Sequence, residues 1–565
     1  MKQAQALSEQ ATYQTTKPVV GVFAAGDPRI DQDSRTRCRN ILKMVADTLA
    51  EQVSTVDVIY TPILVDSESQ ADIVAQQFQA AGVNILVCAP DTWAFPQLSV
   101  LSLLAHFPKR TPINFTCGNS GPKPGVVFAH AINGAVAQSG ILSHLNVGTW
   151  PDTGMNPVMT DGTAKPLVDW VYAAAAYQNI KGKRVVVFGH DSMGMETAMM
   201  HVIPTRNTFG LEITRLDMKL LADMLTKGAY DKEEVKALRD WCNKHVGSIE
   251  LRNDEDSERL NTSLAMYLIV RDLMKDLNAV GGGFMSQLEW GSDTRGIPLP
   301  VADAMESLFN STFDHNGPKP VMPFATEADV QGLLTMLFMS SLMGGEPPLF
   351  MDFRKVWEAW EIKRLAESLK IPMDGSSVWE TKGFFDGNNS GSASFDWAAK
   401  PGTSMEDIMA RVTFPLQDFG YFPGGGNSVT FLTLGGIEGV AGRLCYNTLN
   451  GMFSLIWDEA ASIDLPDPLA DAVCNTTNRE WPHTFLSPKY ATMYEFKQSA
   501  PANHIHMVWN LPPARMQFWM DFTNVLSVTP WAARPSLVEG VDRSIPLLYL
   551  QNGGEDTTKA MLHTR

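Results

Sequence analysis

The chain has 565 residues, which at roughly 150 residues per domain suggests three or four compact units. Hydrophobic residues make up 44% of it and charged residues 19%, a composition that excludes disorder for most of the length. The 62 acidic against 45 basic residues give a net charge of −17, so we expect neither nucleic acid nor an anionic membrane as a partner.

Short β-branched runs alternate with helical stretches in the first part of the chain. Strands are predicted over residues 19–24, 85–89 and 113–116, and helices over 36–52, 125–143 and 166–178. This alternation is typical of a parallel sheet covered by helices on both faces. It predicts an α/β domain over residues 1–178.

The pattern then restarts. Strands are predicted over 184–188 and 213–216, and an acidic cluster marks the start of a long helix over 256–277. A second α/β domain is therefore expected over 179–351. Beyond it, short alternating runs such as SVTFLTLGG and HIHMVWNL predict antiparallel strands, and residues 352–565 are expected to form a β-rich domain or barrel.

Targeting signals are not evident. The longest apolar-rich stretch, residues 330–343, is too short to span a bilayer, and the first sixteen residues lack the apolar core of a signal peptide. The six cysteines are scattered without a CxxC pair, and most sit in apolar runs, where buried free thiols are expected. We predict a reduced, cytoplasmic protein.

Two carboxylates stand out in the second domain. Strands are predicted over 321–325 and 348–351, joined by a helix that Thr326 caps, so Glu327 and Asp352 would follow the carboxyl ends of two strands. Ligands bind at that edge of open α/β sheets, and two carboxylates there suit a divalent cation or general acid/base catalysis. The alternative is a helix cap or a solvated turn, a common role for acidic residues at such positions.

Histidine supplies a possible third ligand. His504 and His506 are two residues apart in a strand-like run, so they face the same side, and one or both could reach a metal. A lone histidine is more often structural, and no local ligand spacing links these two to Asp352. The motif alone therefore leaves both roles open.

Other segments carry weaker signals. The glycine-rich stretch 422–428 allows close approach of the backbone to a ligand, but no GK[ST] follows it, and a tight hairpin is the alternative. Trp93, Trp290 and Trp481 stand in loop-like contexts, where a ring can stack on a sugar or simply pack. GxGxxG and GxSxG motifs are absent, which disfavours dinucleotide cofactors and hydrolase triads.

Several short segments, taken together and in order, resemble the L-fucose isomerase family of aldose–ketose isomerases. KGKRVVVFGHDSMGM is similar to that family's KGK…SMG segment, and GFMSQLEWGSD and NSTFDHNGPKPVMPFATEAD are similar to its GFQGQ and NSSFDWNG…ATEND stretches. FMDFRKVW, FPGGGNS, NREWPHTF and ANH continue in the same order. Collinear matches over nearly the whole chain are far more specific than any one of them.

The resemblance implies two Rossmann-like domains followed by a β-rich, barrel-type C-terminal domain. It also implies a homohexamer with active sites between subunits, and Mn²⁺ as the metal. The family's metal ligands fall on Glu327, Asp352 and His504. Two carboxylates and an imidazole are compatible with Mn²⁺, although Mg²⁺, Co²⁺ and Zn²⁺ suit the same donors.

The implied reaction is an aldose–ketose isomerisation through an enediol. An open-chain aldose binds with O1 and O2 on the cation, which polarises the carbonyl, while one carboxylate removes the C2 proton and an acid returns a proton at C1. Glu327 and Asp352 would be the acid/base pair, and the order in which they act stays open. The family's substrate-binding positions fall on Arg29, Trp93, Met285, Gln287, Asn427, Trp481 and Asn503.

Departures from the family concern the substrate. Its GGGYS tyrosine is Asn427 here, the preceding arginine is Pro423, the first glutamine of GFQGQ is Met285, and His506 is an extra histidine after the ligand. L-Fucose and D-arabinose are the default substrates. The alternatives are the same reaction on a differently substituted hexose, for instance one with an anionic C6 group, and a non-catalytic sugar-binding relative.

Overall fold

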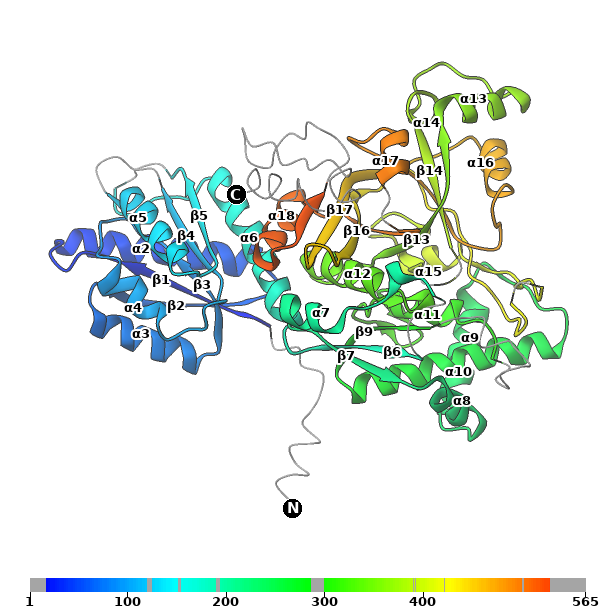
Figure 1. Ribbon diagram of the computed structural model, residues 1–565, viewed down its shortest axis with the longest axis horizontal. Helices are drawn as coiled ribbons and strands as arrows, with labels where there is room; N and C mark the ends of the chain where they lie inside the picture. Colours follow the sequence, from blue (N-terminus) through cyan, green and yellow to red (C-terminus); the bar gives the residue numbers. More distant parts are fainter. Residues whose placement is uncertain are drawn as a thin grey trace. The chain divides into compact units, whose positions relative to one another are not determined.

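The computed structural model describes residues 17–118, 124–150, 154–189, 194–285, 299–389, 391, 393–420, 422–499 and 502–528. The chain forms two compact units (Figure 1). The first unit consists of the chain up to Lys181 together with a later segment, Ala514–Thr523. The second unit consists of Gly182–Pro513 and the chain from Asn524. The predicted division at residues 178 and 351 stays a prediction.

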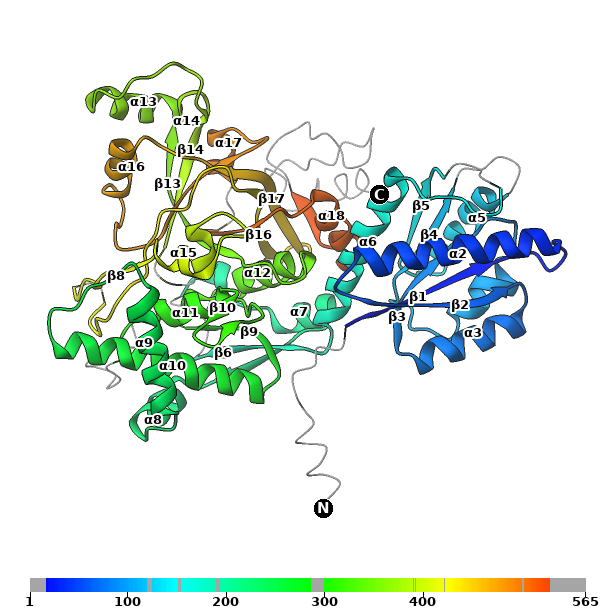
Figure 2. The same ribbon diagram turned by 180° about the vertical axis from the view of Figure 1, so that it is seen from behind.

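The first unit is built on a parallel sheet in the order β2-β1-β3-β4-β5. Its apolar strands are buried because helices cover a parallel sheet, and α2 runs across one face (Figure 2). The strands are β1 (Val19–Ala25), β2 (Asp57–Val65), β3 (Val83–Cys88), β4 (Ile113–Gly118) and β5 (Ser143–Gly148). The helices are α2 (Gln32–Gln52), α3 (Glu68–Ala80), η1 (Gln97–Leu101), α4 (Ser102–Leu104), α5 (Gly125–Gln138), α6 (Asp161–Ile180) and α18 (Pro513–Thr523).

The sequence patterns did not predict strands β2 and β5 or helix α3 of this unit. The predicted helix over 125–143 ends at Gln138, because Gly140 adopts a left-handed φ of 70° and turns the chain. Strand β5 follows and pairs only with β4 among the described strands. Most residues of β5 are half-buried, so it lacks the apolar run that marked β1, β3 and β4.

The second unit contains a parallel sheet in the order β12-β9-β6-β7. Helix α10 begins where the acidic cluster predicted, with the Asn253 side chain accepting from the backbone N–H of Asp256. The strands are β6 (Arg184–Phe188), β7 (Glu212–Leu216), β9 (Ala279–Phe284) and β12 (Phe324–Ala325). The helices are η2 (Glu196–Ala198), α7 (Val202–Phe209), α8 (Met218–Thr226), α9 (Lys232–His245), α10 (Asp254–Asp276), α11 (Asp303–Asn310), η3 (Thr326–Ala328) and α12 (Val330–Leu342).

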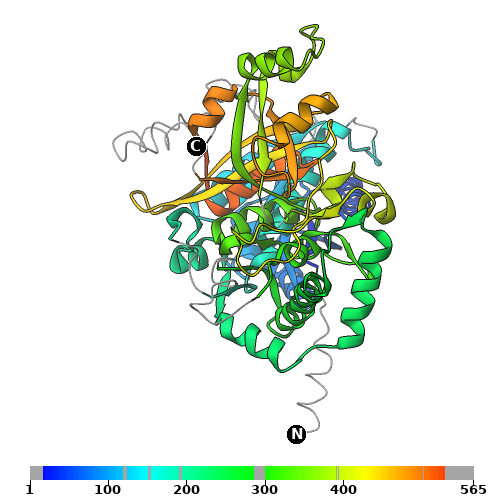
Figure 3. The same cartoon turned by 90° about the vertical axis from the view of Figure 1, so that its right-hand side faces the viewer.

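The same unit contains a seven-stranded mixed sheet in the order β16-β19-β13-β14-β18-β17-β20. Strand β16 also pairs with β17, so six strands have a partner on both sides, and only the β17–β20 pair is parallel. In Figure 3, β13 and β14 rise together toward α13. The strands are β13 (Leu349–Glu358), β14 (Gly383–Asn388), β16 (Glu438–Asn447), β17 (Met452–Ser462), β18 (His483–Pro488), β19 (His504–Trp509) and β20 (Leu526–Val528).

Short elements complete the unit. The helices are α13 (Ala359–Ser368), α14 (Val378–Thr381), η4 (Phe395–Ala398), α15 (Met405–Met409), α16 (Asp467–Cys474) and α17 (Met493–Ser499). Two-residue strands pair β8 (Ser248–Ile249) with β15 (Thr413–Phe414) and β10 (Phe313–Asp314) with β11 (Gly317–Pro318). The predicted class, parallel α/β sheets followed by a β-rich part, is confirmed, while closure of the ring of strands as a barrel stays a prediction.

One hydrophobic cluster of the second unit includes residues of both its parallel sheet and its mixed sheet. Phe324 of β12, Met351 of β13 and Met507 of β19 are buried in the same cluster. This shared core explains why the parallel sheet and the mixed sheet form one unit, and it fixes the ends of β12, β13 and β19 against one another. In the described part of the chain, no helix has both the length and the apolar character that crossing a membrane requires.

Candidate active site

Three side chains from three elements of the second unit converge. Nε2 of His504, at the start of β19, lies 3.5 Å from Oε2 of Glu327 and 3.4 Å from Oδ1 of Asp352. The imidazole is buried with 1% of its side chain exposed, whereas 22% of the Glu327 side chain and 16% of the Asp352 side chain reach solvent. The group is therefore accessible from the carboxylate side only.

Glu327 and Asp352 lie near each other for a different structural reason from the one predicted. Asp352 does not end a strand of a shared parallel sheet, because residues 353–358 continue the alternating pattern and pair with β14. It stands within β13, directly opposite His504 in the mixed sheet, while Glu327 follows β12 of the parallel sheet. The site thus joins residues of two different sheets.

The predicted helix cap at Thr326 is also wrong. The helix begins at Val330, and its cap is Asp329, whose Oδ1 accepts from the backbone N–H of Gly332 at 2.9 Å. Glu327 has a left-handed backbone with φ 56°, and the next residue also has a positive φ. Such a conformation costs about 1–2 kcal/mol per non-glycine residue and is concentrated at functional sites. It takes Glu327 out of the capping position and places its carboxylate beside His504.

The electrostatics of the group are strongly coupled. Burial raises the pKa of Glu327, the charge of His504 opposes this rise, and the neighbouring carboxylates of Asp352 and Asp329 add to it. Burial also disfavours the charged form of His504, but the hydrogen bond and charge of Asp329, followed by the charges of Asp352 and Glu327, raise its pKa. Negative charge gathered around a buried imidazole is an environment that favours a cation.

Two charged residues behind His504 escaped the sequence analysis. Nδ1 of His504 lies 2.7 Å from Oδ2 of Asp329, and Arg443 of β16 pairs with the same carboxylate, its Nη2 donating to Oδ1 at 2.9 Å. Asp329 and Arg443 are both buried. The sequence did contain a signal for this ion pair. Arg443 is the only charged residue in the run GVAGRLCYN, and a charge in an apolar strand indicates a buried partner of opposite charge.

The histidine alternation was predicted correctly. The rings of His504 and His506 both contact Phe350, at centroid distances of 4.5 and 4.9 Å. Their environments differ, because Nε2 of His506 lies 3.4 Å from Nη1 of Arg443 instead of facing the carboxylates. Of the two histidines, His504 is the one whose ring nitrogen faces Glu327 and Asp352.

The donor set fits a divalent cation in its chemistry. It comprises two carboxylates and one imidazole nitrogen, and two adjacent ligand atoms that each lie about 2.1 Å from one ion are about 3 Å apart. The observed separations of 3.4 and 3.5 Å are slightly wider. As the side chains stand, no group of three or more His, Cys, Asp or Glu residues in the described chain completes a metal-binding geometry.

One predicted substrate-binding residue, Asn503, contacts Asp352, and a second, Trp481, is linked to Asp352 through Arg354. Nδ2 of Asn503 donates to Oδ1 of Asp352 at 3.1 Å. Arg354 connects the second, since its Nη1 lies 3.4 Å from Oδ2 of Asp352 and its Cζ lies 5.1 Å from the ring centroid of Trp481. Sequence reasoning had not singled out Arg354.

Asn427 and Met285 take buried positions. Nδ2 of Asn427 donates to the backbone carbonyls of Glu250 and Phe414 at 2.9 and 3.0 Å, so both of its amide hydrogens hold the turn that contains it. Gly426, in the same turn, has a left-handed φ of 101°. Met285 is buried after β9, where its backbone N–H donates to the carbonyl of Phe188.

The remaining predicted residues belong elsewhere. Arg29 and Trp93 lie in the first unit, where Arg29 pairs with Asp27 at 2.6 Å and the Trp93 ring packs edge-on against Phe95. Gln287 lies outside the described residues, as does Trp290. A role in substrate binding stays a prediction for all seven positions.

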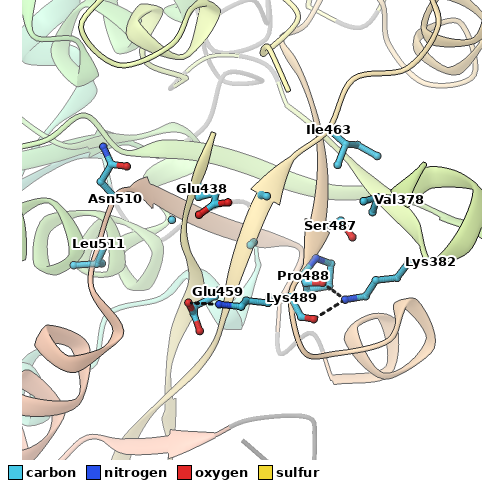
Figure 4. Close-up of a pocket in the computed structure, with 13 residues that line it drawn as sticks. Val378, Lys382, Glu438, Glu459, Ile463, Ser487, Pro488, Lys489, Asn510 and Leu511 are labelled. Atoms are coloured by element: carbon cyan, nitrogen blue, oxygen red, sulfur yellow. Dashed lines mark hydrogen bonds and ion pairs between the residues drawn. The ribbon is translucent and has the colours of Figure 1, made fainter. Parts of the chain in front are cut away.

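The structure also has a pocket of about 530 Å³, shown in close-up in Figure 4. It lies past the end of β19, where Asn510 lines it, whereas His504 stands at the start of that strand. Lys489 pairs there with Glu459 at 3.0 Å, and Lys382 donates to the backbone carbonyl of Lys489 at 2.9 Å. Both lysines are held by protein groups, and none of the three converging side chains lines this pocket.

Comparison with known families agrees with the order of the motifs. Models of the first N-terminal, second N-terminal and C-terminal domains of L-fucose isomerase match residues 17–182, 183–344 and 387–510. The chain belongs to the L-fucose isomerase family. Glu327 lies in the second matched region and His504 in the third, while Asp352 lies between the two.

Individual members are distant relatives over most of their length. The L-fucose isomerase of Vibrio vulnificus is 25% identical over 517 residues, covering 82% of this chain and 84% of that enzyme. Those of Haemophilus influenzae and Escherichia coli O6:H1 are 24% and 23% identical, covering 87% and 93% of this chain and 89% and 97% of those enzymes. Family membership places the chain among the aldose–ketose isomerases.

Proposed function

We propose that this protein is a Mn²⁺-dependent isomerase that interconverts an aldose and a ketose through an enediol. The observation that carries the proposal is the convergence of Glu327 and Asp352 on Nε2 of a buried His504, in a chain of the L-fucose isomerase family. L-Fucose and D-arabinose are the substrates that family membership favours. A soluble, cytoplasmic homohexamer with active sites between subunits, and closure of the six-stranded ring as a barrel, belong to the same proposal.

Glu327, Asp352 and His504 would hold the cation, which when bound acts as a Lewis acid on the sugar carbonyl. Glu327 and Asp352 would take the proton from C2 and return a proton at C1, and their closeness to His504 supports these roles. Asn503 holds Oδ1 of Asp352 by a hydrogen bond, which fixes the direction of that carboxylate. Burial of His504 keeps water away from one side of the site.

The identity of the sugar is the less constrained part of the proposal. Both amide hydrogens of Asn427 donate to backbone carbonyls. Met285 and Pro423 have uncharged side chains, so neither can form an ion pair with a substrate. These departures from the family motivate an alternative in which the same reaction acts on a hexose with a different C6 substituent. An anionic substituent would need a positive charge from a residue other than these three. A sugar-binding relative without catalysis is the second alternative.

The deciding experiment measures isomerisation of L-fucose, D-arabinose and acidic C6-substituted hexoses with Mn²⁺ and with EDTA. We expect turnover of one sugar that requires Mn²⁺ and that falls about 10²–10⁴-fold in Glu327→Gln. The exposed Glu406→Gln, on α15, is the matched control and should keep full activity. Turnover that survives EDTA, or that Glu327→Gln does not change, would contradict the assigned chemistry.

A further inference from the structure

Asp329 lies between the candidate ligand His504 and Arg443, and all three are buried. Its Oδ2 accepts from Nδ1 of His504 at 2.7 Å, and both of its oxygens accept from the guanidinium of Arg443. Arg443 is itself held, because its Nη2 also donates to the backbone carbonyl of Thr197 at 2.6 Å. The contacts form one chain from β16 through the cap of α12 to the start of β19.

The first turn of α12 leaves room for the side chains of this hydrogen-bonded network. A Cβ at Gly332 would lie 2.5 Å from Oδ2 of Asp329, 2.6 Å from Nε2 of His506 and 2.7 Å from Nη1 of Arg443. Real Cβ atoms do not approach other atoms so closely, and Gly332 lacks the left-handed φ that would otherwise call for glycine. The glycine therefore provides room for the guanidinium and the carboxylate.

We propose that Asp329 and Arg443 are positioning residues that hold His504 with its proton on Nδ1, so that Nε2 offers its lone pair to the cation. The proposal rests on the proposed Mn²⁺ site. The physical reason is that a carboxylate accepts from the ring nitrogen beside it, which fixes both the tautomer and the rotation of the ring. Arg443 fixes the carboxylate in turn by bidentate pairing.

The mixed sheet contains a matched control for this contact. Nδ1 of His483 lies 2.9 Å from Oδ1 of Asp386, and both residues are buried. On its other side, Nε2 of His483 faces the backbone carbonyl of Asn478 at 3.0 Å. Asp386→Asn therefore disturbs a buried Asp–His contact of the same kind that includes neither Glu327 nor Asp352.

The first test compares Asp329→Asn with Asp386→Asn in the full chain, at a temperature well below both unfolding midpoints. The dissociation constant for Mn²⁺ is measured from the electron paramagnetic resonance signal of free Mn²⁺, and the visible spectrum is recorded after loading with Co²⁺. We expect Asp329→Asn to weaken Mn²⁺ binding about 10–100-fold and to alter the Co²⁺ spectrum, because an amide no longer fixes the ring. Asp386→Asn should change neither.

A second pair of variants changes no charge. It tests the positioning role of Asp329 and Arg443 even if Asp329→Asn does not fold. Gly332→Ala crowds the network, whereas Gly134→Ala on α5 adds a methyl group with no atom within 4 Å. We expect weaker Mn²⁺ binding in the first and wild-type binding in the second. Wild-type affinity in Asp329→Asn or Gly332→Ala overturns the positioning role alone. A wild-type protein that binds no Mn²⁺ overturns the proposed metal site together with it.

Discussion

Two histidines of the same mixed sheet, His504 and His483, each pair with a buried aspartate, yet their surroundings differ. Nδ1 of His504 meets Asp329 at 2.7 Å, and Nδ1 of His483 meets Asp386 at 2.9 Å. The difference is on the far side of each ring. Two carboxylates and the amide of Asn389, at 3.4 Å, face Nε2 of His504. A backbone carbonyl and the amide of Asn388 lie at 3.0 and 3.2 Å from Nε2 of His483, with no carboxylate among the described contacts of that nitrogen.

The comparison shows that an Asp–His contact alone does not make a reactive group. At His483, burial opposes the charged form, but the charge and hydrogen bond of Asp386, followed by those of Cys474, raise the pKa to about 10. With Nδ1 facing a carboxylate and Nε2 facing a carbonyl, this ring is a protonated structural group at neutral pH. At His504, Nε2 faces two carboxylates that a cation can share, which is the arrangement a metal ligand needs.

Replacing each histidine by glutamine should give the largest contrast. We expect His504→Gln to lower kcat/KM for the best sugar by about 10³-fold or more, since losing a ligand costs more than the 10–100-fold typical of a group behind it. His483→Gln should keep kcat/KM within about threefold, because no reacting group lies near its Nε2. Steady-state kinetics with saturating Mn²⁺ measure both values. Comparable losses of kcat/KM in the two variants would remove the distinction between the pairs.

The pH dependence of stability should separate the structural pair next. The pKa of His483 is about 10 in the folded protein against about 6.5 when unfolded, so its protonation stabilises the fold fully below about pH 6.5. That stabilisation is lost progressively as the pH rises toward 10. Removing one partner of such a buried pair costs about 3 kcal/mol. Asp386→Asn should therefore lower the unfolding midpoint at pH 7, and its difference from wild type should shrink by pH 10 in thermal melts.

A constant difference across that pH range would contradict a protonated His483. Arg479→Gln is a suitable control, because Arg479 is an exposed residue that pairs with the exposed Asp471 at 3.3 Å. Exposed pairs contribute little, so this variant should melt within a degree or two of wild type at both pH values.

Much of the fold was predictable because periodicity survives in the sequence. Strand β6 and helix α10 were found almost to the residue, since an apolar β-branched run and an acidic first turn are local signals. Strand β5 was missed because a half-buried strand has no such run. Strand β13 was cut short at Asp352, because its continuation depends on pairing with β14, which local pattern does not report.

The candidate site, like the fold, was predictable only in part. Glu327, Asp352 and His504 were named from motifs, but nothing in their spacing shows that Asp352 and His504 are direct partners across two strands. Asp329 and Arg443 are separated by more than a hundred residues in sequence, and their pairing exists only after α12 packs against β16. Contacts that tertiary packing creates are therefore the part that sequence reasoning does not reach.

The smallest expected effect comes from changing a hydrogen bond to Asp386, the aspartate of the structural pair. Arg443 binds both oxygens of Asp329, whereas Oδ2 of Asp386 accepts from the hydroxyl of Thr477 at 3.1 Å. Thr477→Val keeps the shape and removes one neutral hydrogen bond, which should cost about 1 kcal/mol of unfolding free energy and leave kcat/KM unchanged. Thr477→Ser keeps the hydroxyl and should retain more of the stability. If Thr477→Val instead weakened Mn²⁺ binding, the two aspartates would belong to one network, and the separation between a structural and a ligand-positioning pair would fail.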